Sequence, residues 1–240
     1  MCRRYLCKHC RRWKGFFMRI NVLQHTPNEG PGSIASWAFS RGHEFFVYHP
    51  YFFDGVLPKA SETDLLIILG GPMSPNDELP WISKERELIK ELLKTNKPIF
   101  GACYGAQQIA KVLGSKITKS PFKEVGWANV IKQNDLMPNL PDKLSVLHWH
   151  EEMFETPEKA TLLFSSELVS NQGYLYKENV IGLQFHLEPQ QSDVNEIVVN
   201  DYSYSLVNNA LKQTTDEIVN FPVPSSNKEI MYAILDFITL

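Results

Sequence analysis

A cysteine stands at the centre of residues 101–105, which read Gly-Ala-Cys-Tyr-Gly. The residues before this segment are typical of a buried strand, and residues 106–113 are typical of a helix that ends at Gly114. Flanking glycines let the chain turn sharply, so the thiol of Cys103 projects at a helix N-terminus, where the thiolate is favoured. The segment predicts a cysteine nucleophile. The alternative is a chance match around a buried structural cysteine.

A second segment, residues 184–188, reads Gln-Phe-His-Leu-Glu and continues an apolar strand expected over residues 180–184. On a strand, side chains i and i+2 face the same side. If this strand neighbours the one before Cys103, His186 can deprotonate the thiol and Glu188 can orient the imidazole and stabilise its charge. The alternative is a buried histidine followed by a glutamate that begins the next helix.

A third segment, Gly-Gly-Pro at residues 70–72, directly follows an apolar strand expected over residues 64–69. Glycines let a backbone N–H approach a ligand closely. Acyl transfer from a carboxamide passes through a tetrahedral oxyanion, and the amides of Gly71 and Tyr104 are the predicted donors to it. An ordinary loop explains the turn but not its occurrence together with the other two segments.

The three segments occur in the order and approximate separation found in class I glutamine amidotransferase domains, which the chain resembles from about Met18 to Glu188. The resemblance implies a Cys103, His186 and Glu188 triad that hydrolyses the side-chain amide of glutamine. It also implies a set of substrate-binding residues, namely Gly70, Gln107, Trp149 and His150.

Two departures qualify the resemblance. Residues 149–152 read Trp-His-Glu-Glu where relatives commonly have a Ser-His-Gly pattern, and Leu187 stands where a proline is usual. The second departure leaves the triad intact. At this position the chain is similar to free-standing members of the family rather than to those fused to a synthetase.

The resemblance implies that glutamine, or another γ-glutamyl compound, is converted to glutamate through a cysteine thioester. A γ-glutamyl peptidase is the close alternative, because the same acyl-enzyme forms when the leaving group is a peptide amine. A non-catalytic scaffold of the same fold is the other. The chain contains no P-loop, pyrophosphatase-type loop or dinucleotide fingerprint. Any acceptor chemistry is therefore expected on a separate acceptor or synthetase subunit, and no cofactor is expected.

The N-terminal residues 1–17 differ from the rest of the chain. They carry six of the 24 Lys and Arg residues, no acid, and three of the four cysteines. We expect a disordered basic extension there, because Cys2, Cys7 and Cys10 with His9 match zinc-site spacing poorly. One domain is then expected over residues 18–240. Its only thiol, Cys103, indicates a reducing compartment, and we expect a cytoplasmic protein.

Residues 18–240 carry a net charge of about −9 with no basic cluster, which argues against nucleic-acid binding. No run approaches the roughly 18 apolar residues of a membrane span.

Strand and helix patterns alternate, with strands expected at 20–24 and 44–48 and helices at 32–40 and 81–95. Later helices are expected at 190–212 and 229–238, and strands at 124–132, 145–150, 161–165, 173–177 and 180–184.

These elements predict an α/β fold: a doubly wound, mostly parallel sheet flanked by helices, with an antiparallel hairpin that carries the His-x-Glu motif.

In the helix at 81–95, Glu85 is expected to face outward with the lysines. His25 and Glu29 follow the first strand as a potential acid–base pair at the same edge as the nucleophile, in a segment expected to be an acceptor-side or lid loop or, alternatively, a plain connector. His148 and His150 alternate along a strand without an apparent third metal ligand, so we expect them at the pocket rim and predict no metal site.

Overall fold

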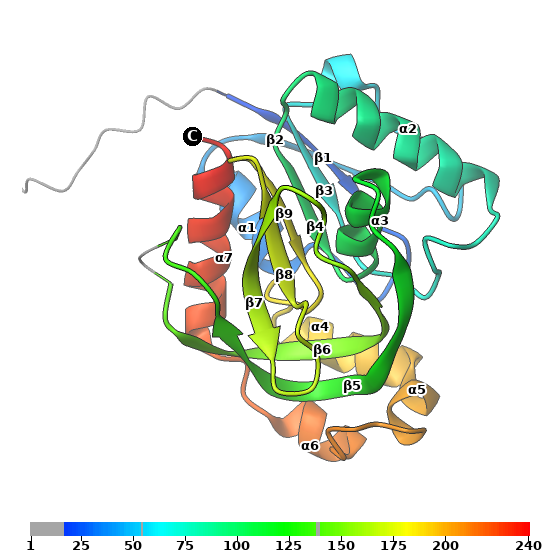
Figure 1. Cartoon of the computed structure of the whole chain (residues 1–240), viewed down its shortest axis with the longest axis vertical. Helices are drawn as coiled ribbons and strands as arrows, with labels where there is room; N and C mark the ends of the chain where they lie inside the picture. The colour runs from blue at the N-terminus through cyan, green and yellow to red at the C-terminus, as the bar shows by residue number, and fades with distance from the viewer. Residues whose placement is uncertain (1–16, 54, 138–139) are drawn as a thin grey trace, which may run out of the picture.

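The computed structural model describes residues 17–53, 55–137 and 140–240 (Figure 1). The basic extension predicted over residues 1–17 lies outside these residues, except for Phe17. None of the helices in the described part of the chain is long and apolar enough to cross a membrane.

A nine-stranded mixed sheet runs through the molecule in the order β2-β1-β3-β4-β9-β8-β7-β5-β6. Its first five strands are parallel to one another: β2 (Glu44–Tyr48), β1 (Arg19–Leu23), β3 (Leu65–Ile68), β4 (Ile99–Ala102) and β9 (Val180–Leu183). The others pair antiparallel: β8 (Gly173–Tyr176), β7 (Ala160–Ser166), β5 (Ile117–Lys132) and β6 (Lys143–Phe154). The predicted α/β class and the antiparallel hairpin, β8 with β9, are confirmed.

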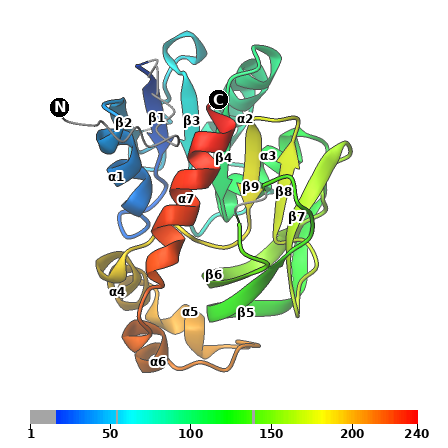
Figure 2. The same cartoon turned by 90° about the vertical axis from the view of Figure 1, so that its left-hand side faces the viewer.

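Helices cover both faces of the parallel half. Helices α1 (Gly32–Ser40) and α7 (Ser225–Ile238) bury apolar side chains against one face and lie side by side in Figure 2, while α2 (Pro80–Lys94) and α3 (Tyr104–Val112) cover the other. Because both faces are covered, every residue of β3 and β4 is buried, which explains their uninterrupted apolar sequences. Trp37 Nε1 donates to Asp236 Oδ1 at 2.7 Å and links α1 to α7.

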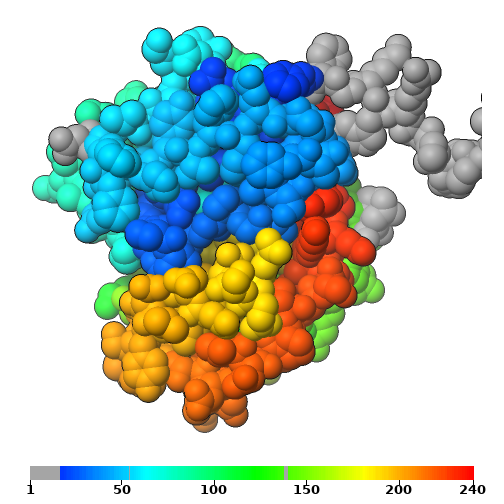
Figure 3. Space-filling model, turned by 180° about the vertical axis from the view of Figure 1, so that it is seen from behind, coloured from blue at the N-terminus to red at the C-terminus, as the bar shows by residue number. Residues whose placement is uncertain are grey.

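The C-terminal helices pack against the antiparallel half. Helices α4 (Gln191–Asn200), α5 (Tyr202–Leu206) and α6 (Thr215–Asn220) lie beside β5 and β6, and α4 and α6 bury apolar residues against Trp127 and Trp149. From behind, α4 to α6 and α7 form one continuous surface below the β1–α1–β2 unit (Figure 3). The single helix expected over 190–212 is therefore wrong, since the chain breaks at Asp201 and leaves helix after Leu206.

Glu85 also differs from its prediction. It belongs to the polar side of α2 by sequence, yet it is fully buried. Its carboxylate accepts a hydrogen bond from the Tyr104 hydroxyl at 3.1 Å and lies 3.4 Å from His25 Nε2. A buried polar network therefore overrides the charge pattern, because α2 packs on α3 at this point.

The topology gathers four segments at one edge of the sheet. Glu29 lies after β1, Gly70 after β3, Cys103 directly after β4, and His186 after β9. Carboxyl ends of parallel strands meet at the same edge, which is where open α/β sheets bind ligands.

Candidate active site

Cys103 lies in a strained turn between β4 and α3, with φ 49° and ψ −111°. Such a conformation is uncommon for a residue with a side chain and is found at nucleophile elbows. The flanking glycines make the turn possible: a Cβ on Gly105 would lie 2.0 Å from the carbonyl oxygen of Ile68, and one on Gly101 would lie 2.6 Å from the carbonyl carbon of Gly105. The elbow therefore packs directly on β3.

The thiol is nearly buried beside β9 and β6. The backbone N–H of Cys103 donates to the Leu183 carbonyl at 2.8 Å, and Sγ lies 3.7 Å from the Trp149 carbonyl oxygen. Gln184 Nε2 lies 3.8 Å from Sγ, and the side-chain oxygen Oε1 of Gln184 accepts from Gln107 Nε2 at 3.2 Å. Polar groups from three elements thus fix the position of the sulfur.

His186 and Glu188 form a buried pair next to the thiol. His186 Nδ1 lies 2.6 Å from Glu188 Oε1, and the second carboxylate oxygen accepts the Leu187 N–H at 3.0 Å. Strand β9 ends at Leu183, so both side chains lie on the segment after it rather than on the strand itself. An isolated antiparallel bridge between His186 and Leu147 of β6 holds this segment instead.

The electrostatics of His186 favour its charged form. Burial alone lowers the pKa of His186, but the Glu188 carboxylate and the Cys103 sulfur together raise that pKa well above its usual range. Among the described residues, none forms a hydrogen bond with His186 Nε2. This nitrogen is therefore left to interact with the Cys103 thiol. The arrangement can carry a proton between sulfur and a leaving group.

The glycine loop after β3 passes close to this pair. A Cβ on Gly70 would lie 2.0 Å from Glu29 Oε2 and 3.0 Å from His186 Cε1, and one on Gly71 would lie 2.6 Å from Met73 Sδ. Larger residues would displace the loop. Tyr104 is the first residue of α3, so its N–H has no intrahelical acceptor and is available to an oxyanion.

A pocket of about 310 Å³ opens over Cys103. Seven of the residues singled out by sequence line it: Glu29, Gly71, Cys103, Tyr104, Gln107, Trp149 and His150. Gly70, His186 and Glu188 are not part of this lining. Sequence reasoning gave no role to the other acids that line the pocket, because they come from three separate segments and share no motif.

His25 and Glu29 take different places. Glu29 lines the pocket, and burial raises its pKa. His25 is buried below the glycine loop, where it stacks on Trp81 and meets the Tyr104 ring edge-on at 4.8 Å. The two residues are therefore not an acid–base pair facing the thiol together, and His25 supports the loop from beneath.

A buried cluster of Glu124, His148 and His150 lies behind the pocket. Pairing of β5 with β6 sets Glu124 opposite His150, and the ligand atoms of the three residues lie within 4.8 Å of one another. The expectation that no third ligand accompanies the histidines was wrong. His148 is fully buried rather than at the rim, and burial lowers its pKa to about 3.

Within the described chain, this cluster is the one group of three that could hold a metal ion. Its carboxylate is already engaged: Ser166 Oγ donates to one oxygen at 2.8 Å and Gln172 Nε2 to the other at 2.6 Å. Burial raises the pKa of Glu124, but His150, His148 and Ser166 together outweigh burial and hold that pKa below its usual range. These hydrogen bonds tie Glu124 of β5 to Ser166 of β7 and to Gln172, while His150 Nε2 at 3.2 Å and His148 Nδ1 at 3.6 Å lie beside the same carboxylate without a hydrogen bond.

Comparison with known proteins agrees with this geometry. Residues 39–204 match the family model "Glutamine amidotransferase class-I", and the chain belongs to that family. YfeJ of Salmonella typhimurium, a glutamine amidotransferase-like protein, is 31% identical over 181 residues, which cover 71% of this chain and 76% of YfeJ.

Two further matches differ in kind. Gamma-glutamyl peptidase 4 of Arabidopsis thaliana is 28% identical over 157 residues, which cover 60% of this chain and 62% of the peptidase. The crystal structure of a glutamine amidotransferase from Thermotoga maritima superposes with a TM-score of 0.86 at 26% identity, and it covers 94% of this chain and 99% of its own. This chain is thus similar both to amidotransferase-like proteins and to a γ-glutamyl peptidase.

Proposed function

We propose that this chain hydrolyses γ-glutamyl amides, glutamine among them, through a thioester on Cys103. The observation that carries the proposal is the strained Cys103 elbow beside a His186–Glu188 pair with a 2.6 Å contact, at the base of one pocket. Membership of the class I family supports the same chemistry.

In the first half of the reaction, the Cys103 thiolate attacks the γ-carbonyl carbon while the amides of Gly71 and Tyr104 stabilise the oxyanion. The C–N bond then breaks, and the imidazolium of His186 gives its proton to the leaving nitrogen. In the second half, water loses a proton to His186 and attacks the thioester. Glutamate leaves, and the thiolate is restored.

A chemical label tests whether Cys103 is a nucleophile at all. An electrophilic glutamine analogue is expected to modify Cys103 much faster in the folded protein than in the same protein denatured in urea, because only the folded site supplies His186 and the oxyanion donors. Intact mass and peptide mapping measure the rates. Equal rates would favour a non-catalytic scaffold.

A γ-glutamyl peptidase is the second candidate, favoured by the similarity to Gamma-glutamyl peptidase 4. We expect free glutamine to be hydrolysed slowly and γ-glutamyl dipeptides more slowly still, because a peptide leaving group must pass Trp149 and the loop that begins at Met73. Values of kcat/KM measured side by side decide between the two. A dipeptide preference above about tenfold, roughly 1.4 kcal/mol in transition-state binding, would assign the chain to the peptidases.

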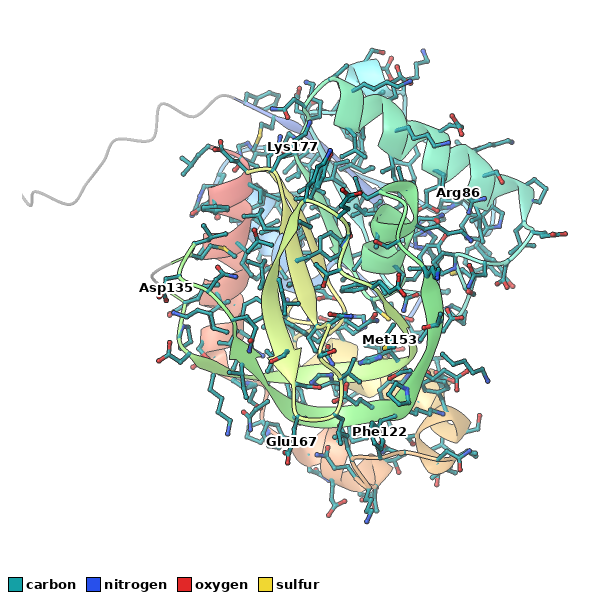
Figure 4. The ribbon with its side chains drawn as sticks, viewed as in Figure 1. Arg86, Phe122, Asp135, Met153, Glu167 and Lys177 are labelled. Atoms are coloured by element: carbon teal, nitrogen blue, oxygen red, sulfur yellow. The ribbon has the colours of Figure 1, made fainter. Side chains whose placement is uncertain are left out.

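The Glu188 carboxylate provides a pH test of the triad. Replacing Glu188 by glutamine is expected to move the alkaline limb of the kcat/KM profile down by at least about one pH unit. The carboxylate stabilises protonated His186, so its loss lowers the pKa of His186 and the proton donor is lost at lower pH. Glu167→Gln, on an exposed glutamate between β7 and β8 (Figure 4), serves as the control. An unshifted limb in Glu188→Gln would assign the proton transfer to another residue.

A further inference from the structure

The pocket over Cys103 is lined by an excess of acidic side chains. Five carboxylates line it, namely Glu29, Asp77, Glu151, Glu152 and Asp201, and its lining includes no lysine or arginine. They come from the segments after β1, after β3, within β6 and between α4 and α5. Folding therefore concentrates in one pocket acids that are dispersed in the sequence.

These charges are only partly offset, because Lys123 interacts with Glu151 and Asp201, and Lys119 with Glu152, at longer range. Within the part of the chain that the structure describes, none of the five forms an ion pair. Three accept hydrogen bonds from uncharged donors: Asp77 from the Ser74 N–H at 2.9 Å, Glu152 from the Ser74 hydroxyl at 3.0 Å, and Asp201 from Trp149 Nε1 at 2.9 Å. These bonds orient the carboxylates and leave their charge in place.

Glu29 and Glu151 have no such donors among the contacts of the described chain. Glu151 is exposed, whereas Glu29 is partly buried close to the His186 ring. One basic side chain, Lys123, lies nearby. Its Nζ sits 3.5 Å from the centre of the Tyr204 ring and donates to the Tyr204 carbonyl at 2.5 Å. Lys123 does not line the pocket, and the Tyr204 ring, which does, is in contact with it.

The pKa values of two pocket groups, Glu152 and Tyr204, are both raised. Burial raises the pKa of Glu152 and the Ser74 hydrogen bond lowers it, while Asp77 and Glu151 add to the rise and Lys119 opposes it, with a raised pKa as the net result. Burial likewise raises the pKa of Tyr204, with added contributions from Cys103, Glu151 and Asp201. Burial is the largest cause of both shifts and neighbouring negative groups add to them, so a bound cation would lower both pKa values.

A glutamine zwitterion does not balance this charge, because its α-ammonium and α-carboxylate cancel. The pocket volume of about 310 Å³ lies at the lower end of the roughly 300–1,000 Å³ range of small-molecule sites. A site of this size takes at most a short, unbranched chain on the leaving nitrogen. The excess of carboxylates determines what that chain should carry.

We propose that the pocket selects γ-glutamyl amides whose leaving amine bears a second, positively charged amino group, as in the γ-glutamyl derivatives of short aliphatic diamines. This proposal rests on the proposed function, because the amide is cleaved by the same thioester route. Water and the amide give glutamate and the free diamine, with no redox step. The acids also repel a leaving amino acid's carboxylate, which agrees with the slow hydrolysis expected for γ-glutamyl dipeptides.

Two amides of matched shape test the proposal. One is the γ-glutamyl amide of 1,4-diaminobutane, and the other is γ-glutamyl pentylamide, in which a methyl group replaces the terminal ammonium. At low ionic strength we expect kcat/KM to favour the cationic amide by at least about tenfold, and the ratio to shrink in 0.5 M salt as charges are screened. A ratio below about two at low salt would overturn the proposal.

Substitutions then locate the source of the preference. Glu151→Gln is expected to lower the cationic-to-neutral ratio about threefold, because it removes one negative charge while preserving shape. Using a ratio cancels any effect on the chemistry common to both amides. Glu167→Gln removes an exposed charge that does not line the pocket and should leave the ratio unchanged. Equal changes in the two variants would point to net charge rather than the pocket.

Binding separates this proposal from the proposed function. If neither amide nor glutamine is hydrolysed, the proposed function fails, and the selectivity is measured directly by calorimetry on Cys103→Ala with each amide. Tighter binding of the cationic amide, reduced by Glu151→Gln in the same background, supports a cation-selective pocket. Equal affinities for the two amides contradict it.

Discussion

Replacing Cys103 by alanine is expected to lower kcat/KM for glutamine by at least about 10⁴-fold, and His186→Ala by a similar factor, since nucleophile and base act as one unit. Glu188→Gln should retain a higher rate, because the residue orients the imidazole without touching the substrate. Coupled measurement of glutamate release over several enzyme concentrations checks all three variants against the unmodified chain.

The same variants need proof of folding. Cys103 is small, so we expect Cys103→Ala to melt near the unmodified protein, whereas His186→Ala leaves the buried Glu188 carboxylate without its partner and should melt lower. An unchanged near-ultraviolet circular dichroism spectrum below the melting transition is the proof of folding for both variants. The double variant Cys103→Ala, His186→Ala should lose little more activity than either single variant. Near-normal turnover by Cys103→Ala would refute the thioester mechanism.

Local sequence patterns predicted much of the fold. Apolar runs of four to six residues predicted the parallel strands, because strands buried on both faces need no polar alternation. Helix α1 and strand β2 occur with the predicted bounds, Gly32–Ser40 and Glu44–Tyr48. The antiparallel half was harder to predict, since β5 is a 16-residue strand with a register shift between Lys119 and Glu124. Its alternation is broken there, and the sequence indicates only the part from Glu124 onward.

Buried polar networks mark the limit of sequence reasoning for the site. Cys103, His186 and Glu188 lie in segments whose spacing is itself a signal. Glu85 and Glu124 lie in amphipathic or alternating segments where a carboxylate ordinarily faces water. Each is buried because a partner on another element satisfies it, and only the tertiary structure identifies that partner. The same holds for the pocket acids, which folding assembles from four segments.

Adding one methyl group at Gly105 is expected to disrupt both the fold and the chemistry. In Gly105→Ala the new Cβ would lie 2.0 Å from the Ile68 carbonyl oxygen, which belongs to the backbone of β3 and cannot rotate away. Helix α3 must therefore shift off the sheet. Overpacking of this kind costs about 1–3 kcal/mol, and each kcal/mol lowers the melting temperature of a chain this size by roughly 2–4 °C.

The shift also moves Cys103 and the Tyr104 N–H, which lie at the start of the same helix. A displacement of about 1 Å in a catalytic group lowers the rate roughly 10²-fold, so the folded fraction of Gly105→Ala should show a loss of that order in kcat/KM. Gly30→Ala is the matched control, because nothing lies within 4 Å of its added Cβ. Thermal melts and glutamine kinetics on both variants are the measurement. If Gly105→Ala melts and turns over like Gly30→Ala, then close contact between the elbow and β3 does not hold the nucleophile in place.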